Sequence, residues 1–251
     1  KSVDIMPKWH GNLYNWYKID TYRPINNFIS SVDSGNFLAC FMIVNEFFKD
    51  KNFQKGVEIA ERIIEDTDLD RLYDFRKGLF YIGFNEKSGE YTGHYDILAS
   101  EARILSMIYI ARSGKAEHWR NLQRDYTPLM GNTLLSWSGT MFEYLMADLF
   151  IDSPRFSLLH ESSYKAATIQ SRSAVKGIWG VSESCYYEFD DELRYQYYAF
   201  GLKKLSLRSD FDRSTVSPYS SILALKYIPN EVMENLSKIE DQIAHYIKET
   251  S

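Results

Sequence analysis

Three glutamates of this chain stand in apolar or aromatic surroundings, where a carboxyl group is uncommon. They are Glu101, Glu143 and Glu183. Breaking a glycosidic bond requires two carboxyl groups that flank it, one of which is kept protonated by its surroundings. An apolar setting lined by aromatic rings raises the pKa of a carboxyl group and allows a neutral acid near pH 7. Glycoside chemistry is therefore a candidate activity.

Glu101 has the setting expected of the protonated acid. It follows Leu98 by three residues and precedes Leu105 by four, so a helix over 96–113 would place it on the apolar stripe. Asp96 would cap that helix. The same spacing also fits a solvated or salt-bridged glutamate near a helix N-terminus, where the macrodipole favours acids.

Glu183 has the setting expected of an ionised partner. Ser182, Ser184 and Tyr186 lie close to it in the sequence, and hydroxyl donors stabilise a carboxylate in its charged form. The two carboxyl groups of a retaining enzyme are about 5–5.5 Å apart, and those of an inverting enzyme lie further apart to admit a water. The sequence does not give this distance, so both stereochemical alternatives stay open.

Composition predicts a globular protein and excludes several classes of partner. The 251 residues are 45% hydrophobic and 25% charged, with a net charge of −5, which indicates neither nucleic-acid binding nor an anionic membrane surface. No apolar stretch is long enough to span a membrane, and no signal peptide is present. We expect a cytoplasmic chain that makes no membrane contact itself, within a parent protein that could be membrane-associated.

The aromatic content is the unusual feature of the composition. Aromatic residues make up 16% of the chain, and 19 of them are tyrosines. Tyrosine suits a surface that stacks on sugars, although a tyrosine-rich protein interface would have the same composition. Aromatic residues gather in segments 9–17 and 190–200. The first segment fits a sugar subsite and an arm packed over the core about equally well.

The sequence shows no pattern for a metal or a nucleotide. The five histidines are scattered, without an H-x-x-x-H or H-E-x-x-H spacing, and neither glycine-rich phosphate-binding motif occurs. Cys40 and Cys185 are too few for a disulfide scaffold and favour a reducing compartment. We therefore predict no metal site and no cofactor.

The elements that position the glutamates are predicted to be mostly helices. Helices are expected at about 37–49, 52–65, 96–113, 116–123, 140–150, 156–175, 218–227 and 230–248. Asp33 or Ser34 would cap the first of these. A β-hairpin with a glycine in its turn is expected over 79–92. This pattern predicts an all-α fold built from helical hairpins.

Six segments carry a family resemblance. They are L-Y-N-W-Y (13–17), S-V-D-S-G-N (31–36), Y-D-I-L-A-S-E-A-R (95–103), L-L-S-W-S-G-T-M-F-E-Y-L-M (134–146), W-G-V-S-E-S (179–184) and Y-Q-Y-Y-A-F-G (195–201). In order and spacing they resemble the glucoamylase-like domain of bacterial cyclic β-1,2-glucan synthases over nearly the whole chain. The same segments resemble the endo-β-1,2-glucanases more distantly.

The resemblance implies an (α/α)6 toroid with a sugar-binding cleft, and anomer-retaining transglycosylation that cyclises a linear β-1,2-glucan. Glu101 would be the acid/base and Glu183 the nucleophile, while Glu143 would bind sugar or orient a catalytic group. Because a full toroid needs well over 251 residues, we expect residues 1–251 to be a catalytic domain that holds an incomplete part of the toroid. The chain would then be a piece of a larger multidomain protein.

The resemblance also implies a set of residues that contact the glucan. They are Trp16, Asp33, Asn36, Tyr95, Asp96, Trp137, Glu143, Trp179, Tyr186, Gln196 and Tyr197. Each aromatic member, taken alone, is more often part of a hydrophobic core than of a subsite.

The sequence is also compatible with two other functions. One is an inverting endo-β-1,2-glucanase, in which water replaces the sugar acceptor and another carboxylate, such as Asp33, acts as the base. The other is a non-catalytic, helical carbohydrate-binding module whose carboxylates are structural. In that module Glu101 and Glu183 would lie far apart or would pair with arginines such as Arg103 or Arg194.

Overall fold

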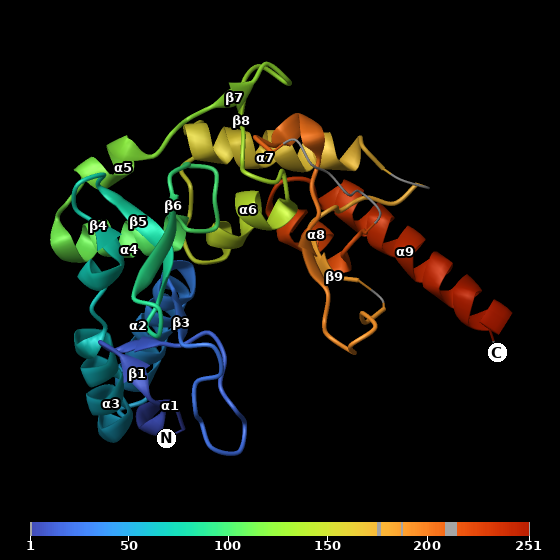
Figure 1. Cartoon of the computed structure of the whole chain (residues 1–251). Helices are drawn as coiled ribbons and strands as arrows, with labels where there is room; N and C mark the ends of the chain where they lie inside the picture. Colours follow the sequence, from blue (N-terminus) through green and yellow to red (C-terminus); the bar gives the residue numbers. More distant parts are fainter. Residues whose placement is uncertain (1, 175–176, 187, 209–214, 251) are drawn as a thin grey trace. The chain divides into compact units, whose positions relative to one another are not determined.

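The chain divides into two compact units. The computed structural model describes residues 2–174, 177–186, 188–208 and 215–250 (Figure 1). The first unit comprises Lys1–Asp96 and Ala102–Gln123, and the second comprises Ile97–Glu101 and Arg124–Ser251. Each unit has its own secondary structure and core, and each is described by itself.

The expected all-α fold, an (α/α)6 toroid with one small β-hairpin, is wrong. The described residues form nine α-helices and four small antiparallel sheets, which makes the fold mixed α/β. Most of the strands are only two or three residues long. A strand that short leaves no alternating pattern in the sequence, because its position is set by the strand with which it pairs.

The first unit is organised around a four-stranded antiparallel sheet. Strands β5 (Leu79–Asn85) and β6 (Glu90–Tyr95) form the hairpin that the sequence predicts. Strands β3 (Phe28–Ser30) and β4 (Tyr73–Asp74) also pair with β5. Phe80 of β5 is 1% exposed, which identifies the covered face of the sheet. A separate two-stranded sheet joins β1 (Lys8–Trp9) to β2 (Asn12–Leu13).

Five helices of the described residues complete the first unit. They are α1 (Ser2–Ile5), α2 (Ser31–Asp50), α3 (Gln54–Asp66), α4 (Arg103–Ser113) and α5 (Glu117–Asn121). Helix α2 begins six residues before the predicted start. Its N-cap is Ser30, whose Oγ accepts a hydrogen bond from the backbone N–H of Asp33 at 3.2 Å. The predicted caps, Asp33 and Ser34, therefore lie inside the helix.

The second unit holds four helices and two small sheets within its described residues. The helices are α6 (Met141–Leu145), α7 (Leu158–Ser171), α8 (Pro218–Leu223) and α9 (Pro229–Thr250). The sheets pair β7 (Tyr126–Thr127) with β8 (Thr133–Leu134) and β9 (Glu183–Cys185) with β10 (Tyr197–Ala199). Tyr144, Leu145 and Phe200 are among its buried core residues. Among the described residues, no helix combines the length and apolarity that a membrane crossing needs.

Most predicted helices exist, with shifted ends. The helix predicted over 140–150 is α6 followed by a 3-10 turn at Met146–Leu149. The helix predicted over 156–175 is α7, and residue 175 lies outside the described residues. The helix predicted over 96–113 is wrong in its first half, because α4 begins only at Arg103. Glu101 therefore lies before the helix and not on it.

Candidate active site

Glu143 is the most enclosed of the three glutamates. It is 4% exposed and occupies the third position of α6, where it closes a capping box with Thr140. The Thr140 N–H donates to Glu143 Oε2 at 2.9 Å, and the Ser138 N–H donates to Oε1 at 3.0 Å. Ser136 Oγ donates to Oε2 at 2.9 Å. Glu143 thus fastens the turn that precedes its own helix.

The contacts of Glu143 favour its ionised form. Ser136 Oγ accepts a hydrogen bond from the Gly139 N–H at 2.8 Å, so its own proton is free to point at the carboxylate. Every hydrogen bond to the two carboxylate oxygens is then donated by a neighbour. Burial raises the pKa of Glu143, and the hydrogen bonds from Thr140, Ser138 and Ser136 oppose that rise. Glu143 is a fixed acceptor in the second unit.

Glu101 lies in a turn directly before α4, so its predicted place on a helix is wrong. Ile97, Leu98 and Ala99 are all buried, and the helix that follows them begins only at Arg103. The Ser100 hydroxyl donates to Glu101 Oε2 at 3.0 Å. The turn, rather than a helix face, presents the carboxyl group.

The surroundings of Glu101 disfavour its charge. Burial raises the pKa of Glu101 to about 8, and the negative charges of Glu143 and Glu183 add to the rise. A carboxyl group with this pKa is mostly protonated at pH 7. The three glutamates therefore lie close enough within the second unit to influence one another's ionisation.

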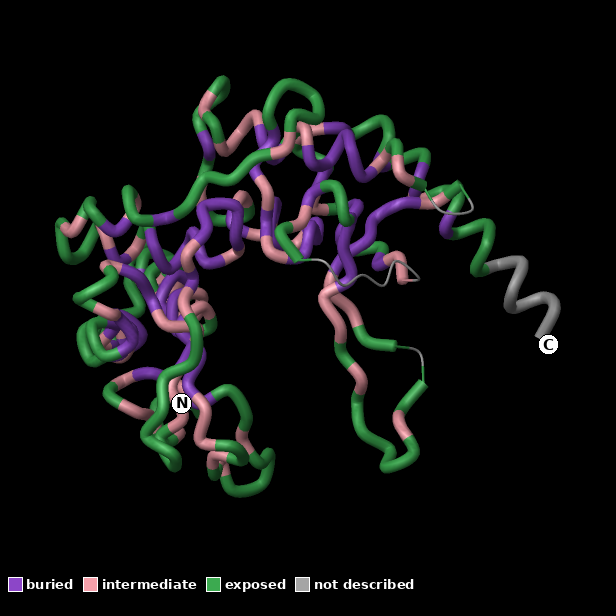
Figure 2. The backbone as a smooth tube through the Cα atoms, turned by 45° about the horizontal axis from the view of Figure 1, so that its top comes forward, coloured by how far each residue is buried: buried purple, intermediate pink, exposed green. Residues whose placement is uncertain are grey.

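Glu183 is the first residue of β9, at the base of the β9–β10 hairpin. The register pairs Glu183 with Ala199 and Cys185 with Tyr197. The hydroxyl of Tyr197 donates to Glu183 Oε2. Burial raises the pKa of Glu183 to about 7, while the Tyr197 hydrogen bond opposes the rise and the charge of Glu143 adds to it. Figure 2 shows this hairpin passing from intermediate burial at its base to exposure at its tip.

A chain of hydrogen bonds anchors the backbone at Glu183. The Phe142 N–H donates to Ser182 Oγ at 3.1 Å, and Ser182 Oγ lies 3.0 Å from the hydroxyl of Tyr219. The Tyr219 hydroxyl donates to the carbonyl oxygen of Glu183 at 2.8 Å, so Ser182 is the donor in the bond between the two hydroxyls. The chain ties β9 to α6 and α8.

Two buried amides hold the segment that leads into Glu183, and neither is among the residues that the sequence predicts for the site. Gln170 on α7 accepts from the Val181 N–H at 3.1 Å and donates to the Val181 carbonyl at 3.0 Å. Asn235 on α9 makes the same pair of bonds with Trp179, at 2.9 and 2.8 Å. Both amides are 1% exposed. The sequence signal that could have indicated each amide is a single polar residue on an otherwise apolar helix face.

The predicted glucan contacts in the second unit differ in their exposure. Tyr197 and Tyr186 are exposed on the hairpin, where Tyr186 packs against Phe200. Gln196 donates to an Asp190 carboxylate oxygen at 3.0 Å.

The two predicted tryptophans of this unit are more enclosed. Trp137 lies within the turn that precedes α6 and is partly buried. Trp179 is 5% exposed and its backbone is held by Asn235, so the structure places it in the core of this unit.

The other predicted contacts belong to the first unit. Trp16 and Asp33 line a cavity of about 380 Å³ together with Tyr14 and Asn15. Trp16 is 61% exposed. This cavity has the stacking ring and the polar groups that a sugar subsite needs.

Asn36, Tyr95 and Asp96 do not line that cavity. Asn36 lies on α2 and is partly buried, and Tyr95 is buried at the end of β6. The Asp96 carbonyl accepts a hydrogen bond from the Gln123 N–H at 2.7 Å. Within the first unit, these three residues therefore lie outside the cavity that Trp16 and Asp33 line.

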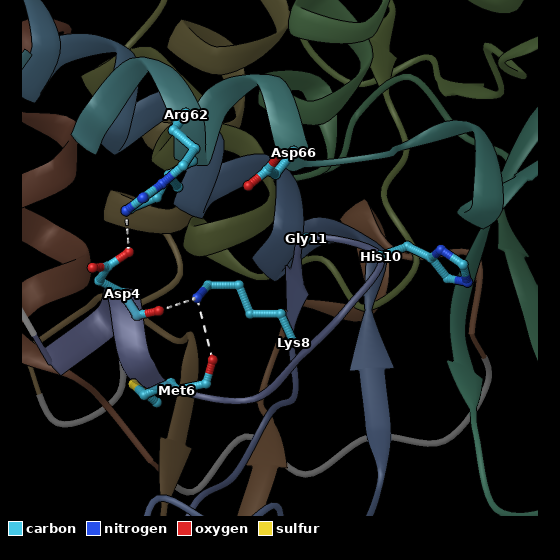
Figure 3. Close-up of a pocket in the computed structure, with 8 residues that line it drawn as sticks. Asp4, Met6, Lys8, His10, Gly11, Arg62 and Asp66 are labelled. Atoms are coloured by element: carbon cyan, nitrogen blue, oxygen red, sulfur yellow. Dashed lines mark hydrogen bonds and ion pairs between the residues drawn. The ribbon is translucent and has the colours of Figure 1, made fainter. Parts of the chain in front are cut away.

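A larger cavity in the first unit has a structural explanation. It measures about 530 Å³, and three of its charged residues, Asp4, Lys8 and Arg62, make contacts within its lining (Figure 3). Lys8 donates to the carbonyl oxygens of Val3, at 2.7 Å, and Met6, at 3.2 Å, while Arg62 forms an ion pair with Asp4. These contacts fix α1 against α3. Across the described ranges, no group of three or more metal-ligating side chains is arranged to hold a metal ion.

Comparisons with known proteins agree with the family resemblance in the sequence. Residues 93–249 match the family described as “Putative glucoamylase”. Over 190 residues the chain is 34% identical to cyclic β-(1,2)-glucan synthase NdvB of Rhizobium meliloti (strain 1021). That alignment covers 73% of this chain and 7% of the synthase.

Two solved structures of an endo-β-1,2-glucanase from Talaromyces funiculosus resemble the fold. One is a mutant in complex with β-1,2-glucan, and the other is a complex with sophorose. Each matches with a TM-score of 0.66 at 11% identity, covering 91% of this chain and 53% of the glucanase chain. At this identity the likeness shows a shared fold. The chain spans about half of the glucanase and a small part of the synthase.

Proposed function

Because the chain belongs to this glucoamylase family, we propose that it acts on β-1,2-glucan by anomer-retaining transglycosylation, which closes a linear glucan into a ring. The observation that carries the proposal is the cluster of Glu101, Glu143 and Glu183 in one compact unit, where their charges act on one another. A glycosidase needs such a pair of carboxyl groups with different ionisation.

In the first step, protonated Glu101 gives its proton to the glycosidic oxygen. A carboxylate oxygen of Glu183 attacks the anomeric carbon as the bond from that carbon to the leaving sugar breaks. The products are a glycosyl ester on Glu183, ionised Glu101 and a released sugar chain with a free hydroxyl group.

In the second step, Glu101 acts as the base. It takes the proton of a hydroxyl group on the acceptor sugar, and that oxygen attacks the anomeric carbon of the ester. The bond to Glu183 breaks with its electron pair, which restores the carboxylate, and Glu101 is protonated again. If the acceptor is the far end of the same chain, the product is a cyclic glucan.

The ionisation of the two groups supports this division of roles. The pKa of Glu101, about 8, lies above that of Glu183, about 7. The Tyr197 hydrogen bond lowers the pKa of Glu183, and the charges of Glu143 and Glu183 raise that of Glu101, so a single proton on the pair favours Glu101. The names of the relatives, a β-1,2-glucan synthase and an endo-β-1,2-glucanase, suggest the substrate class.

The second candidate is hydrolysis with inversion. The name of the structural relative, an endo-β-1,2-glucanase solved in complex with β-1,2-glucan, favours hydrolysis. Water would replace the sugar acceptor, and a different carboxylate would act as the base. Proton NMR of the first product separates the candidates, because β-anomer indicates retention and α-anomer indicates inversion.

The proposed roles are tested with Glu101→Gln and Glu183→Gln. Each variant is incubated with linear β-1,2-glucan, and cyclic and linear products are measured by mass spectrometry. Glu240→Gln, on the exposed side of α9, is the matched control. Loss of turnover in the first two variants and normal turnover in the control support the proposal. Wild-type turnover in either of the first two would refute the assignment of that residue.

A further inference from the structure

The β9–β10 hairpin places a tyrosine hydroxyl on the proposed nucleophile. Glu183 pairs with Ala199, and Tyr197 pairs with Cys185, so Glu183 and Tyr197 are diagonal neighbours on one face of the hairpin. Diagonal neighbours in an antiparallel pair are within reach of a long or aromatic side chain. The Tyr197 hydroxyl donates to Glu183 Oε2 across this diagonal.

The phenol of Tyr197 keeps its proton when it makes this bond. Burial raises the pKa of Tyr197, and the charge of Glu183 and its hydrogen bond raise it further. The hydroxyl is thus a donor throughout the neutral pH range. Within the described part of the chain, it is the side chain that donates to the Glu183 carboxylate.

We propose that Tyr197 is a positioning residue for Glu183: its hydroxyl binds Oε2, stabilises the charge and leaves Oε1 to attack the anomeric carbon. The inference rests on the proposed role of Glu183 as nucleophile. It gives Tyr197 a function through its hydroxyl, distinct from the stacking role expected of its ring.

Two features of the hairpin make the hydroxyl group effective. The Glu183 carbonyl is fixed by the Tyr219 hydroxyl at 2.8 Å, so the backbone beneath the carboxylate is anchored. The Tyr197 end of the pair is held by the strand register. Rotation of the Glu183 side chain is then the remaining freedom, and the bond to Oε2 restricts it. A preorganised nucleophile needs less reorganisation when the substrate arrives.

Replacing Tyr197 by phenylalanine separates the hydroxyl group from the ring. Tyr197→Phe keeps a ring that can stack on a sugar and removes the donor. A hydrogen bond to a charged group has a free energy that corresponds to a change of roughly 10- to 100-fold in rate. We expect kcat to fall by about that factor. KM should stay within about twofold, because the ring remains available for substrate binding.

The pH profile gives a second measurement of the same bond. The donated hydrogen bond favours the ionised form of Glu183. Without it, Glu183 holds its proton to higher pH, so the acidic limb of the kcat/KM profile should move upward in Tyr197→Phe. Tyr195→Phe is the matched control, since Tyr195 is an exposed tyrosine two residues earlier on the same hairpin. Its kcat and its pH profile should match the wild type.

The outcomes separate this inference from the proposed function. Thermal unfolding of Tyr197→Phe is measured alongside, to show that the variant is folded. If Glu183→Gln is inactive while Tyr197→Phe keeps the wild-type kcat and acidic limb, the positioning role is overturned and the proposed function stands. A rise in KM alone would also overturn it, in favour of a stacking role. Full activity of Glu183→Gln would overturn both.

Discussion

At the scale of residues, the site is defined by three glutamates of one unit that differ in their hydrogen-bond donors and neighbouring charges. Glu143 accepts hydrogen bonds from Thr140, Ser138 and Ser136, which stabilise a charge. Glu101 accepts from the Ser100 hydroxyl and from its own backbone N–H, but burial and the charges of Glu143 and Glu183 outweigh these bonds and disfavour its charge. The contrast follows from where the donors lie, since all three residues are glutamates with the same ordinary pKa.

The first prediction concerns the dependence of activity on pH. Turnover requires Glu183 ionised and Glu101 protonated. Their pKa values are about 7 and about 8, so kcat/KM should be bell-shaped, falling below the first value as Glu183 gains a proton and above the second as Glu101 loses one. The measurement is the initial rate of glucan turnover across the pH range. A flat maximum in the acidic range would contradict these assignments.

The second prediction concerns stability. The folded protein raises the pKa of Glu101 above its ordinary value, so folding favours the protonated form. That contribution is complete below the ordinary pKa and is lost as the pH rises through about 8. Glu101→Gln removes the ionisable group and should raise the free energy of unfolding at alkaline pH by about 1–3 kcal/mol.

Urea titrations at acidic and alkaline pH measure this effect. The gain in Glu101→Gln should be present at pH 9 and should shrink toward pH 4. A gain of equal size at both pH values would point to a packing effect of the amide and would contradict the electrostatic explanation. Glu240→Gln again provides a solvent-exposed control.

The identity of the candidate residues could be predicted from the sequence, but their environments could not. The sequence indicates Glu101 and Glu183 as a pair, and the structure places both in the second unit. The setting expected for Glu101, an apolar helix face, is wrong, because α4 begins only at Arg103 and Glu101 lies in the turn before it. The sequence does not indicate Tyr219, because its bond to Glu183 joins residues that are 36 positions apart.

At the scale of elements, the turn from Ser136 to Thr140 organises the base of the site. Gly139 has φ of +71°, a region that a residue with a side chain rarely adopts. A Cβ added there would lie 2.4 Å from the carbonyl oxygen of Leu202. The turn and the segment after β10 therefore pack with almost no space between them.

The third prediction follows from this packing. Gly139→Ala should destabilise the protein by about 2 kcal/mol or more, because it combines backbone strain with a clash against backbone atoms. It should also lower activity, since the Ser138 and Thr140 N–H groups that hold Glu143 flank it. Gly131→Ala is the matched control: Gly131 has φ of +74°, but a Cβ there meets nothing within 4 Å. Thermal unfolding of the two variants measures the effect of the clash. Equal losses of stability in both variants would contradict a clash at Gly139.

Elements with long, regular patterns could be predicted, and short ones could not. Helices α3, α7 and α9 and the β5–β6 hairpin lie close to their expected positions. The two-residue strands β4, β7 and β8 gave no signal because their pairing depends on distant partners. The same reason explains the wrong all-α expectation.

At the scale of the whole molecule, the net charge predicts how activity depends on salt concentration. The chain has a net charge of −5, and the proposed substrate, a β-1,2-glucan, is neutral. The charge of the protein therefore does not change the rate at which this substrate associates. Raising the salt concentration from about 50 to about 500 mM should change kcat/KM by less than about twofold. A change of about tenfold or more would indicate a charged substrate or partner.

The central claim is that Glu183 is the nucleophile of a retaining enzyme, and trapping its covalent intermediate tests this most directly. Glu101→Gln lacks the acid/base, so a β-1,2-linked glucosyl donor with a fluoride leaving group should react with Glu183 and stop at the ester. Intact-mass and peptide mass spectrometry should show one added glycosyl unit, located on Glu183. An unmodified protein that releases α-anomeric product, or an adduct on another residue, would contradict the account.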